Sequence, residues 1–309
     1  MRQNSEIEKV KSIHLKGSED KKLKKILKNK WFIIAIIFIA IVCLASTYIG
    51  SMYNQTKYSY VINNYQEKVS SLSKDDIEDK EQKAKKYNNS LNDLSSTGKY
   101  DKDTVTGYYD VLNLGKIISY IDIPKIDVYL PIYNNTDDKT LQNGIGHEKS
   151  SSLPVGGTNT NCVLLGHSGL TTNPLFTDLH KLDTGEYIYL KTMNKTYTYK
   201  VYDIDKVTPE EAENYTGIVK GKDIVTLITC TPIGINTHRL IVRGERVDNT
   251  QSNKANQTED NNSNSIENVR EKLITIGLIV MIVAILFTFS YCMRKGEKKK
   301  KGDKKSKRK

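Results

Sequence analysis

Cysteine, proline, tryptophan and histidine are all scarce in this chain of 309 residues, which has 4, 6, 1 and 5 of them. Four cysteines are too few to cross-link a chain of this length, which excludes a disulfide-dense secreted miniprotein. The length allows one mid-sized domain or two small ones, each with a proper hydrophobic core. Any thiol chemistry must therefore use one of a very small set of side chains.

Acidic residues are also the minority, 36 against 47 basic residues, but this imbalance is confined to the two ends of the chain. Residues 1–30 and 294–309 together hold 21 basic and 6 acidic residues, and the remainder holds 26 basic and 30 acidic residues. A basic domain surface is the electrostatic footprint of nucleic-acid binding. Since the region between the ends has a net charge of −4, no nucleic-acid partner is expected.

Two uncharged runs lie beside the basic ends, 20 residues at 31–50 and 21 residues at 273–293. Each matches the roughly 20 apolar residues that a helix needs to cross the hydrocarbon core of a bilayer. Lys and Arg flank the outer end of each run, so the positive-inside rule places both termini in the cytoplasm. The sequence predicts a two-pass protein of the cell membrane, with the segment between the runs outside the cell.

The two ends of the chain also allow other interpretations. A cleaved signal peptide has an apolar stretch of only ~7–15 residues, so the longer first run favours an uncleaved signal anchor. Cys43 suggests a lipoprotein, but no small residue immediately precedes its thiol, and we interpret Cys43 and Cys292 as ordinary membrane cysteines. The Lys-rich tail 294–309 can bind anionic lipid specifically or simply fix the topology.

The composition and the spacing of apolar residues change along the segment between the two uncharged runs. Residues 58–94 show the apolar spacing of one or two amphipathic helices, and 248–272 have the polar composition of a solvated linker. Between them lie seven short β-rich runs separated by turn sequences. We expect these strands to form a closed β-barrel or sandwich over 115–247: 117–123, 128–133, 162–165, 187–191, 196–203, 224–230 and 240–242.

Of the two cysteines between the apolar runs, Cys230 is the better candidate for chemistry. Cys162 lies within a β-rich run, where the default role of a cysteine is that of a small buried hydrophobic side chain. Cys230 ends the run 224–230 just before a loop begins at Pro232, and reactive groups are usually displayed at such strand ends. A nucleophilic thiol needs a proton-transfer partner and a group that stabilises an oxyanion.

His167 and Arg239 are the candidates for these two roles. His167 follows a β-rich run and has glycines on both sides, although a histidine so placed is often an ordinary loop residue. Arg239 lies nine residues beyond Cys230, so it can face the thiol across a hairpin and donate charge-assisted hydrogen bonds to an oxyanion. The alternative for Arg239 is a surface ion pair.

The residues around these candidates resemble the motifs of the sortase family. Residues 226–244, which contain both Cys230 and Arg239, resemble the active-site strand pair of class C, the group that polymerises pilins. Gly166-His167-Ser168-Gly169 resembles the histidine motif of the family, and the resemblance covers about residues 115–247. A membrane helix at each end is also typical of class C. Three further segments resemble the opening strands and loop of the family domain: 120–126, 130–133 and 152–157.

The resemblance implies a role for each candidate residue. Cys230 is the expected nucleophile, His167 the proton-transfer partner and Arg239 the stabiliser of the oxyanion. Thr229 is expected to line the same pocket as a substrate-binding hydroxyl. The implied fold is mainly β, a closed sortase-type barrel of about 7–8 strands with N-terminal helices, flanked by two transmembrane helices.

The resemblance also implies a reaction and its partners. An LPxTG-like sorting signal of a surface or pilin protein is cleaved between Thr and Gly through a thioacyl enzyme, and the acyl group is joined to a pilin lysine amine. This chemistry requires no metal and no organic cofactor. Two alternatives are an anchoring sortase whose acceptor is a peptidoglycan amine, and a non-catalytic sortase-like scaffold at the membrane.

Two positions depart from the class C pattern. Class C enzymes commonly carry an Asp-Pro-aromatic lid before the barrel, whereas residues 95–114 contain no proline. Tyr100-Asp101 and Tyr109-Asp110 are the available substitutes. Ile233 stands where many members have tyrosine, a change expected to affect the substrate groove more than the chemistry.

The expected domain organisation combines these predictions. It consists of a cytoplasmic basic tail (1–30), a transmembrane signal anchor (31–50), an extracellular helical and lid region (51–114), a catalytic barrel (115–247), a flexible linker (248–272), a second transmembrane helix (273–293) and a cytoplasmic basic tail (294–309).

Overall fold

The computed structural model describes residues 30–97, 108–112, 114–115, 117–170 and 173–248, together with 277, 281, 282 and 285. The predictions made for the linker, for both cytoplasmic tails and for Tyr100-Asp101 lie outside the described residues, apart from Lys30 and Asp248 at the borders. So does nearly all of the second apolar run.

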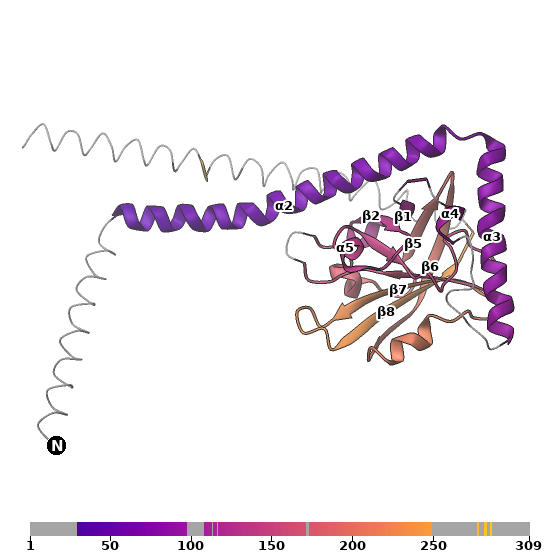
Figure 1. Cartoon of the computed structure of the whole chain (residues 1–309). Helices are drawn as coiled ribbons and strands as arrows, with labels where there is room; N and C mark the ends of the chain where they lie inside the picture. Colours follow the sequence, from indigo (N-terminus) through magenta and orange to yellow (C-terminus); the bar gives the residue numbers. More distant parts are fainter. Residues whose placement is uncertain are drawn as a thin grey trace, which may run out of the picture. The chain divides into compact units, whose positions relative to one another are not determined.

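Two long helices precede the barrel (Figure 1). Helix α2 runs from Lys30 to Ser70 and α3 from Lys74 to Thr97, so the amphipathic pattern predicted over 58–94 corresponds to the end of α2 and most of α3. The helical conformation breaks between the two helices, and α3 begins with a capping box. The Ser73 hydroxyl accepts a hydrogen bond from the backbone N–H of Asp76, and the carboxylate of Asp76 accepts hydrogen bonds from the backbone N–H and the hydroxyl of Ser73.

Membrane crossing is not established by these helices. Residues 31–50 are helical and form the first part of α2. Within the part of the chain that is described, however, no helix has both the length and the hydropathy that a membrane span requires. The two transmembrane helices therefore stay predictions.

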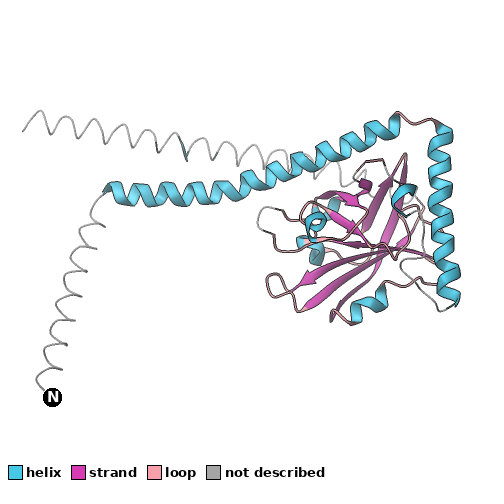
Figure 2. Ribbon diagram, in the orientation of Figure 1, coloured by secondary structure: helices cyan, strands magenta, loops and turns pink. Residues whose placement is uncertain are grey.

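The barrel is closed by eight strands in the order β1-β2-β3-β4-β7-β8-β6-β5. Figure 2 shows the strands, in magenta, gathered into this one body. This confirms the prediction of a mainly β fold with a closed barrel. The strands are β1 (Ile117–Ile123), β2 (Val128–Tyr133), β3 (Ile145–His147), β4 (Thr160–Leu165), β5 (Tyr187–Thr192), β6 (Lys195–Val207), β7 (Asp223–Thr231) and β8 (His238–Arg246). Short helices lie in the connections: α4 (Tyr108–Val111), η1 (Pro124–Ile126), α5 (Asp138–Leu141), η2 (Thr177–Lys181) and η3 (Glu211–Tyr215).

Strand β7 is buried on both of its faces. Val225 and Leu227 point into the main core of the barrel, whereas Ile228 packs on the outer face with Ile241 of β8 and Ala212 of η3. Two-sided burial explains why residues 224–230 form a nearly continuous apolar run rather than an alternating one. The outer covering ends at the carboxyl end of β7, which is where the candidate nucleophile lies.

Candidate active site

Cys230 and Arg239 lie directly opposite each other in the antiparallel pair β7–β8. Opposed residues in such a pair have Cβ atoms about 4.5–5.5 Å apart and point to the same face of the sheet. Alternation along β7 places Cys230 on the outer face with Ile228, and both Cys230 and Arg239 are only partly exposed. The hairpin on which the sequence argument depended is therefore present, and the thiol and the guanidinium share one face.

His167 reaches the same level from a neighbouring strand. Strand β4 runs parallel to β7, with Leu165 opposite Ile228, and the N–H of Gly166 donates to the Ile228 carbonyl over 3.1 Å. His167 follows Leu165 by two residues, and Cys230 follows Ile228 by two residues. Because the two strands are parallel and Leu165 pairs with Ile228, His167 lies at the level of Cys230. The loop after β4 and the β7–β8 hairpin, which are distant in sequence, thus place His167, Cys230 and Arg239 at one end of the barrel.

Both neighbours of His167 are tied to the strand that carries the thiol. The Thr229 hydroxyl donates to the Gly166 carbonyl over 2.7 Å, and the Ser168 hydroxyl donates to the Cys230 carbonyl over 2.6 Å. Thr229 is only 4% exposed, so its hydroxyl acts here as a link between strands. Its expected role in substrate binding stays a prediction, and the link made by Ser168 was not foreseen.

The glycines around His167 allow this close approach. A Cβ atom at Gly166 would lie 2.6 Å from the ring of Phe176, and one at Gly169 would lie 2.6 Å from Ile233 Cγ2. Gly169 also has a φ of 77°, which side chains rarely tolerate. The loop after His167 is therefore pressed against its neighbours and can hold the imidazole in a defined place.

The guanidinium of Arg239 is held by the turn that joins β7 to β8. Its Nη1 donates to the carbonyls of Asn236 and His238, over 3.2 and 3.1 Å. Both bonds use one of the three guanidinium nitrogens, and Arg presents five N–H donors in a planar fork. The orientation is therefore set by backbone acceptors, and the fork retains donors suited to a carbonyl or an oxyanion.

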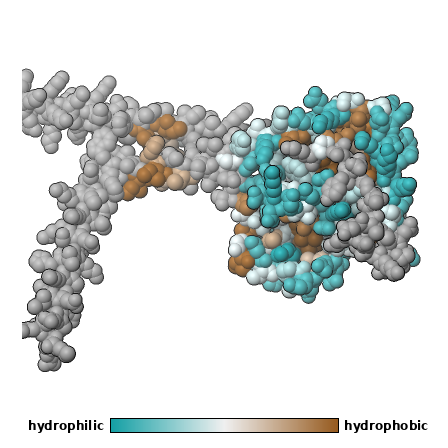
Figure 3. All heavy atoms as spheres, viewed as in Figure 1, coloured by the Kyte–Doolittle hydropathy of each residue, from teal (hydrophilic) through white to brown (hydrophobic). Residues whose placement is uncertain are grey.

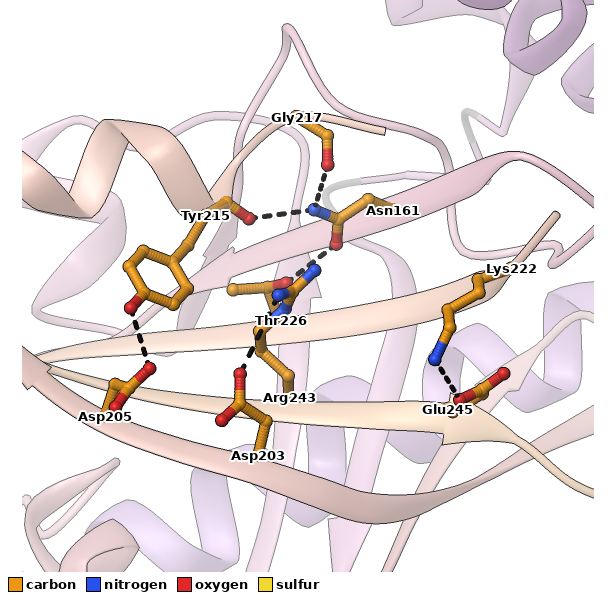
Figure 4. Close-up of polar contacts among 9 residues, drawn as sticks. All are labelled: Asn161, Asp203, Asp205, Tyr215, Gly217, Lys222, Thr226, Arg243 and Glu245. Atoms are coloured by element: carbon orange, nitrogen blue, oxygen red, sulfur yellow. Dashed lines mark hydrogen bonds and ion pairs between the residues drawn. The ribbon is translucent and has the colours of Figure 1, made fainter. Parts of the chain in front are cut away.

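Elsewhere on the strands that lead to the site, a polar network joins residues of β4, β6, β7 and β8 to η3 (Figure 4). The Asn161 amide donates to the carbonyl of Tyr215 over 2.9 Å and accepts from the hydroxyl of Thr226 over 2.8 Å. Arg243 faces Asp203 at 3.7 Å and lies over the ring of Tyr215. The network ties η3 to β4, β7, β8 and β6, and β4, β7 and β8 are the strands that lead to His167, Cys230 and Arg239.

The other cysteines and histidines of the described region have different surroundings. Cys162 is 2% exposed and burial raises the pKa of its thiol, which confirms its predicted role as a small buried side chain. His180 Nδ1 lies 2.9 Å from the carbonyl of Thr177, within its own helical turn, and His238 pairs with Thr231 across the hairpin. Among the described residues, no group of His, Cys, Asp and Glu side chains has an arrangement that could hold a metal ion.

His147 is completely buried and joins α4 to the barrel. Its Nε2 lies 2.8 Å from the Ser152 carbonyl, which can only accept, so Nε2 carries the proton. Nδ1, 2.8 Å away, then accepts from the hydroxyl of Tyr108, whose ring stacks on the imidazole. Burial is the main cause that lowers the pKa of His147 to about 4. The adjoining Tyr109-Asp110, the second candidate for a lid sequence, lies in α4.

The depressed pKa of His147 predicts an acid-sensitive fold. Between the unfolded value near 6.5 and the folded value of about 4, the unfolded chain binds the proton more readily. The stabilising contribution is complete above pH 6.5 and is lost as the pH falls to 4, about 3 kcal/mol in all. Urea unfolding at pH 7 and pH 4.5 measures it. A His147→Gln variant should show a shallower decline, and an equally steep decline would contradict the assignment.

Comparisons with known proteins agree with this geometry. The Sortase domain family model matches residues 121–247. The chain is 33% identical to the protein named Sortase A of Bacillus anthracis, over 44% of this chain and 62% of that protein. It is also 33% identical to Sortase A of Streptococcus agalactiae, over 59% of this chain and 71% of that protein.

Two solved structures are similar to the chain over most of their own length. One is Streptococcus pneumoniae Sortase C, described for its catalysis and pilin substrate specificity, with 36% identity and a TM-score of 0.55 over 61% of this chain and 97% of the other. The second is Clostridium perfringens sortase C with the C-terminal cell wall sorting motif, with 40% identity and a TM-score of 0.54 over 62% and 99%. The chain belongs to the sortase family, whose members are cysteine transpeptidases.

Proposed function

We propose that this chain is a membrane-anchored sortase of the class C type that joins pilin subunits. The observation that carries the proposal is the placement of His167, Cys230 and Arg239 on one face at the ends of three neighbouring strands. The proposed substrate is a protein with an LPxTG-like sorting signal. In support, the similar Clostridium perfringens structure is described with its sorting motif, and the similar Streptococcus pneumoniae enzyme with pilin specificity.

The first half of the reaction forms a thioester. The Cys230 sulfur, as thiolate, attacks the carbonyl carbon of the threonine in the signal, and the resulting oxyanion accepts hydrogen bonds from Arg239. When the C–N bond to glycine breaks, the imidazolium of His167 gives a proton to the departing amine. The products are the thioacyl enzyme and a free glycine amine.

The second half transfers the acyl group to a new amine. A lysine amine of the next pilin attacks the thioester carbonyl and loses a proton to His167, and the C–S bond then breaks to release the Cys230 thiolate. Arg239 faces the same developing oxyanion in this step. An isopeptide bond forms, and no metal or organic cofactor takes part.

The proposed placement in the cell has the barrel outside and both termini in the cytoplasm. Its support is the pair of uncharged runs with Lys and Arg at their outer ends. In this arrangement 51–114 and 115–247 form the extracellular helical region and the catalytic barrel, and 248–272 links the barrel to the second span. The cytoplasmic tails are 1–30 and 294–309.

The acceptor amine has two candidates, a pilin lysine and an amine of a peptidoglycan precursor. Two curated relatives carry the name Sortase A rather than sortase C, and residues 95–114 contain no proline. Both observations favour an alternative acceptor, an amine of a peptidoglycan precursor. The idle-scaffold alternative requires instead that Cys230 never becomes acylated.

One experiment separates these possibilities. The full chain in detergent is incubated with a sorting-signal peptide and, as competing acceptors, a pilin domain and a peptidoglycan stem peptide, and the products are identified by mass spectrometry. We expect an acyl adduct on Cys230 and an isopeptide bond to the lysine of the pilin. A product on the stem peptide alone would replace pilin joining with anchoring. Lack of any adduct on Cys230 would leave the scaffold.

Ser168 gives a further test, because its hydroxyl fixes the loop of His167 against the Cys230 strand. A Ser168→Ala change should lower kcat about three- to tenfold, with KM little changed, since an imidazole that drifts by a fraction of an ångström transfers protons less well. Ser168→Thr retains the hydroxyl and should restore most of kcat. Steady-state kinetics on a quenched fluorescent peptide measures both. An unaltered kcat in the alanine variant would refute the positioning role.

A further inference from the structure

The exposed large apolar side chains of the barrel gather at one end. Within 117–170 and 173–248 they are Leu170, Ile233 and Ile235, which are 37%, 49% and 67% exposed. Leu170 lies three residues after His167, and both isoleucines lie in the turn between Cys230 and Arg239. Figure 3 shows hydrophobic atoms at the edge of the barrel where the β7–β8 turn projects in Figure 1. Single exposed apolar residues are common, but a cluster around one mouth marks an interaction surface.

Helix α2 meets the barrel at this same end. Lys57 donates a hydrogen bond to the side chain of Asn143, just before β3, and Tyr58 lies against Asn173, in the loop that follows His167. Further along α2, the hydroxyl of Tyr65 donates to the carbonyl of Ile118, near the start of β1, and accepts from the N–H of Met193, just after β5. Going from Lys57 towards its N-terminus, α2 therefore leaves the barrel on the side of the candidate active site.

The distance from the barrel to the first uncharged run is short. That run ends at residue 50, seven residues before Lys57, and α2 is an unbroken helix through both positions. At 1.5 Å per residue, the separation along the helix is about 10 Å. The headgroup layer on each side of a bilayer is about 5–8 Å thick. Loops that project from this end of the barrel can therefore reach the headgroups of a membrane that holds residues 31–50.

The composition of the β7–β8 turn suits that location. Residues 232–237 contain no charged side chain, and His238 and the basic residue Arg239 follow directly. Apolar side chains flanked by basic ones are favoured where a protein surface meets anionic lipid. Among three occupants, namely a bilayer, a second copy of the chain and an apolar segment of a substrate, the direction of α2 favours the bilayer.

We propose that the β7–β8 turn, with Ile235 exposed in it, rests in the lipid headgroup layer, so that the candidate active site opens at the membrane surface. The inference rests on the membrane anchoring proposed above. It places the thiol of Cys230 close to the plane where a membrane-held substrate presents its cleavage site. The lipid contact then orients the whole barrel on α2 and limits the approach of substrates to those at the membrane surface.

Fluorescence quenching tests the location directly. The full chain is placed in vesicles of phosphatidylcholine and phosphatidylglycerol, in a Trp31→Phe background that removes the only tryptophan. Tryptophan is introduced by Ile235→Trp or, as a control, by Lys220→Trp, an exposed position in the turn before β7, at the opposite end of the barrel. Lipids brominated near the headgroup should quench Ile235→Trp and not Lys220→Trp. Equal quenching of the two, or quenching of Ile235→Trp only at high protein density, would overturn the proposal.

A second test of the proposal compares peptide turnover on vesicles with peptide turnover in solution. Ile235→Asn should lower turnover of a sorting signal tethered to the same vesicles about fivefold or more, through loss of interfacial binding, and leave turnover of a short soluble peptide unchanged. A parallel loss on both substrates would assign Ile235 to the substrate groove, and no loss on either would remove the functional role; both results contradict the proposal. If the wild type cleaves neither substrate while Ile235→Trp is still quenched, the proposed function fails and the lipid contact stands.

Discussion

Replacing Cys230 with alanine is expected to abolish transpeptidation, with a rate loss of about 10⁴-fold or more, as seen when a covalent nucleophile is removed. The thiol stands at the end of β7, partly exposed and outside the buried layers, so its loss leaves no cavity in the core. The fold should therefore persist, with an unchanged circular dichroism spectrum and melting temperature. Mass spectrometry of the protein after incubation with a sorting-signal peptide should show no acyl adduct.

Cys162→Ala is the matched control for this experiment. Its thiol is buried in the main core, so the change should leave peptide cleavage intact and lower stability by roughly 1 kcal/mol, the transfer free energy of one small buried group. The two variants thus separate chemistry from packing. Cleavage that survives in Cys230→Ala would disprove the assignment of the nucleophile. An equal loss of cleavage in both variants would point to general disruption of the barrel.

The strands of the barrel were largely predictable because their side chains repeat in the way that burial demands. Runs 117–123 and 128–133 coincide with β1 and β2, and 224–230 covers all but the end residues of β7. Strand β3 was missed since three residues, one of them a glycine and one a histidine, give no period to recognise. Strand β8 extends to Arg246, well beyond the predicted 240–242, because β6 and β7 pair along its whole length.

Some features of the candidate site are visible in the spacing of residues along the sequence, and others arise only from packing. A separation of nine positions from Cys230 to Arg239 is enough to suggest a hairpin, and the register confirms it. The links made by Ser168 and by the pair of Tyr108 and His147 join segments far apart in sequence. No local pattern reports such contacts, because they depend on which strands become neighbours when the barrel closes.

The second large effect concerns Arg239. Arg239→Ala should lower kcat about 10²- to 10³-fold, the usual cost of losing one oxyanion donor, and alkylation of Cys230 by a small electrophile should continue. Arg239→Lys should recover part of the loss, since an ammonium is a point charge without the planar fork. Arg243→Lys is the control. Arg243 lies on the same strand as Arg239 but contacts Asp203 and Tyr215, so its replacement should change the melting temperature rather than kcat. Full turnover by Arg239→Ala would show that the guanidinium opposite the thiol does not stabilise the oxyanion, and a donor from the backbone would have to take that role.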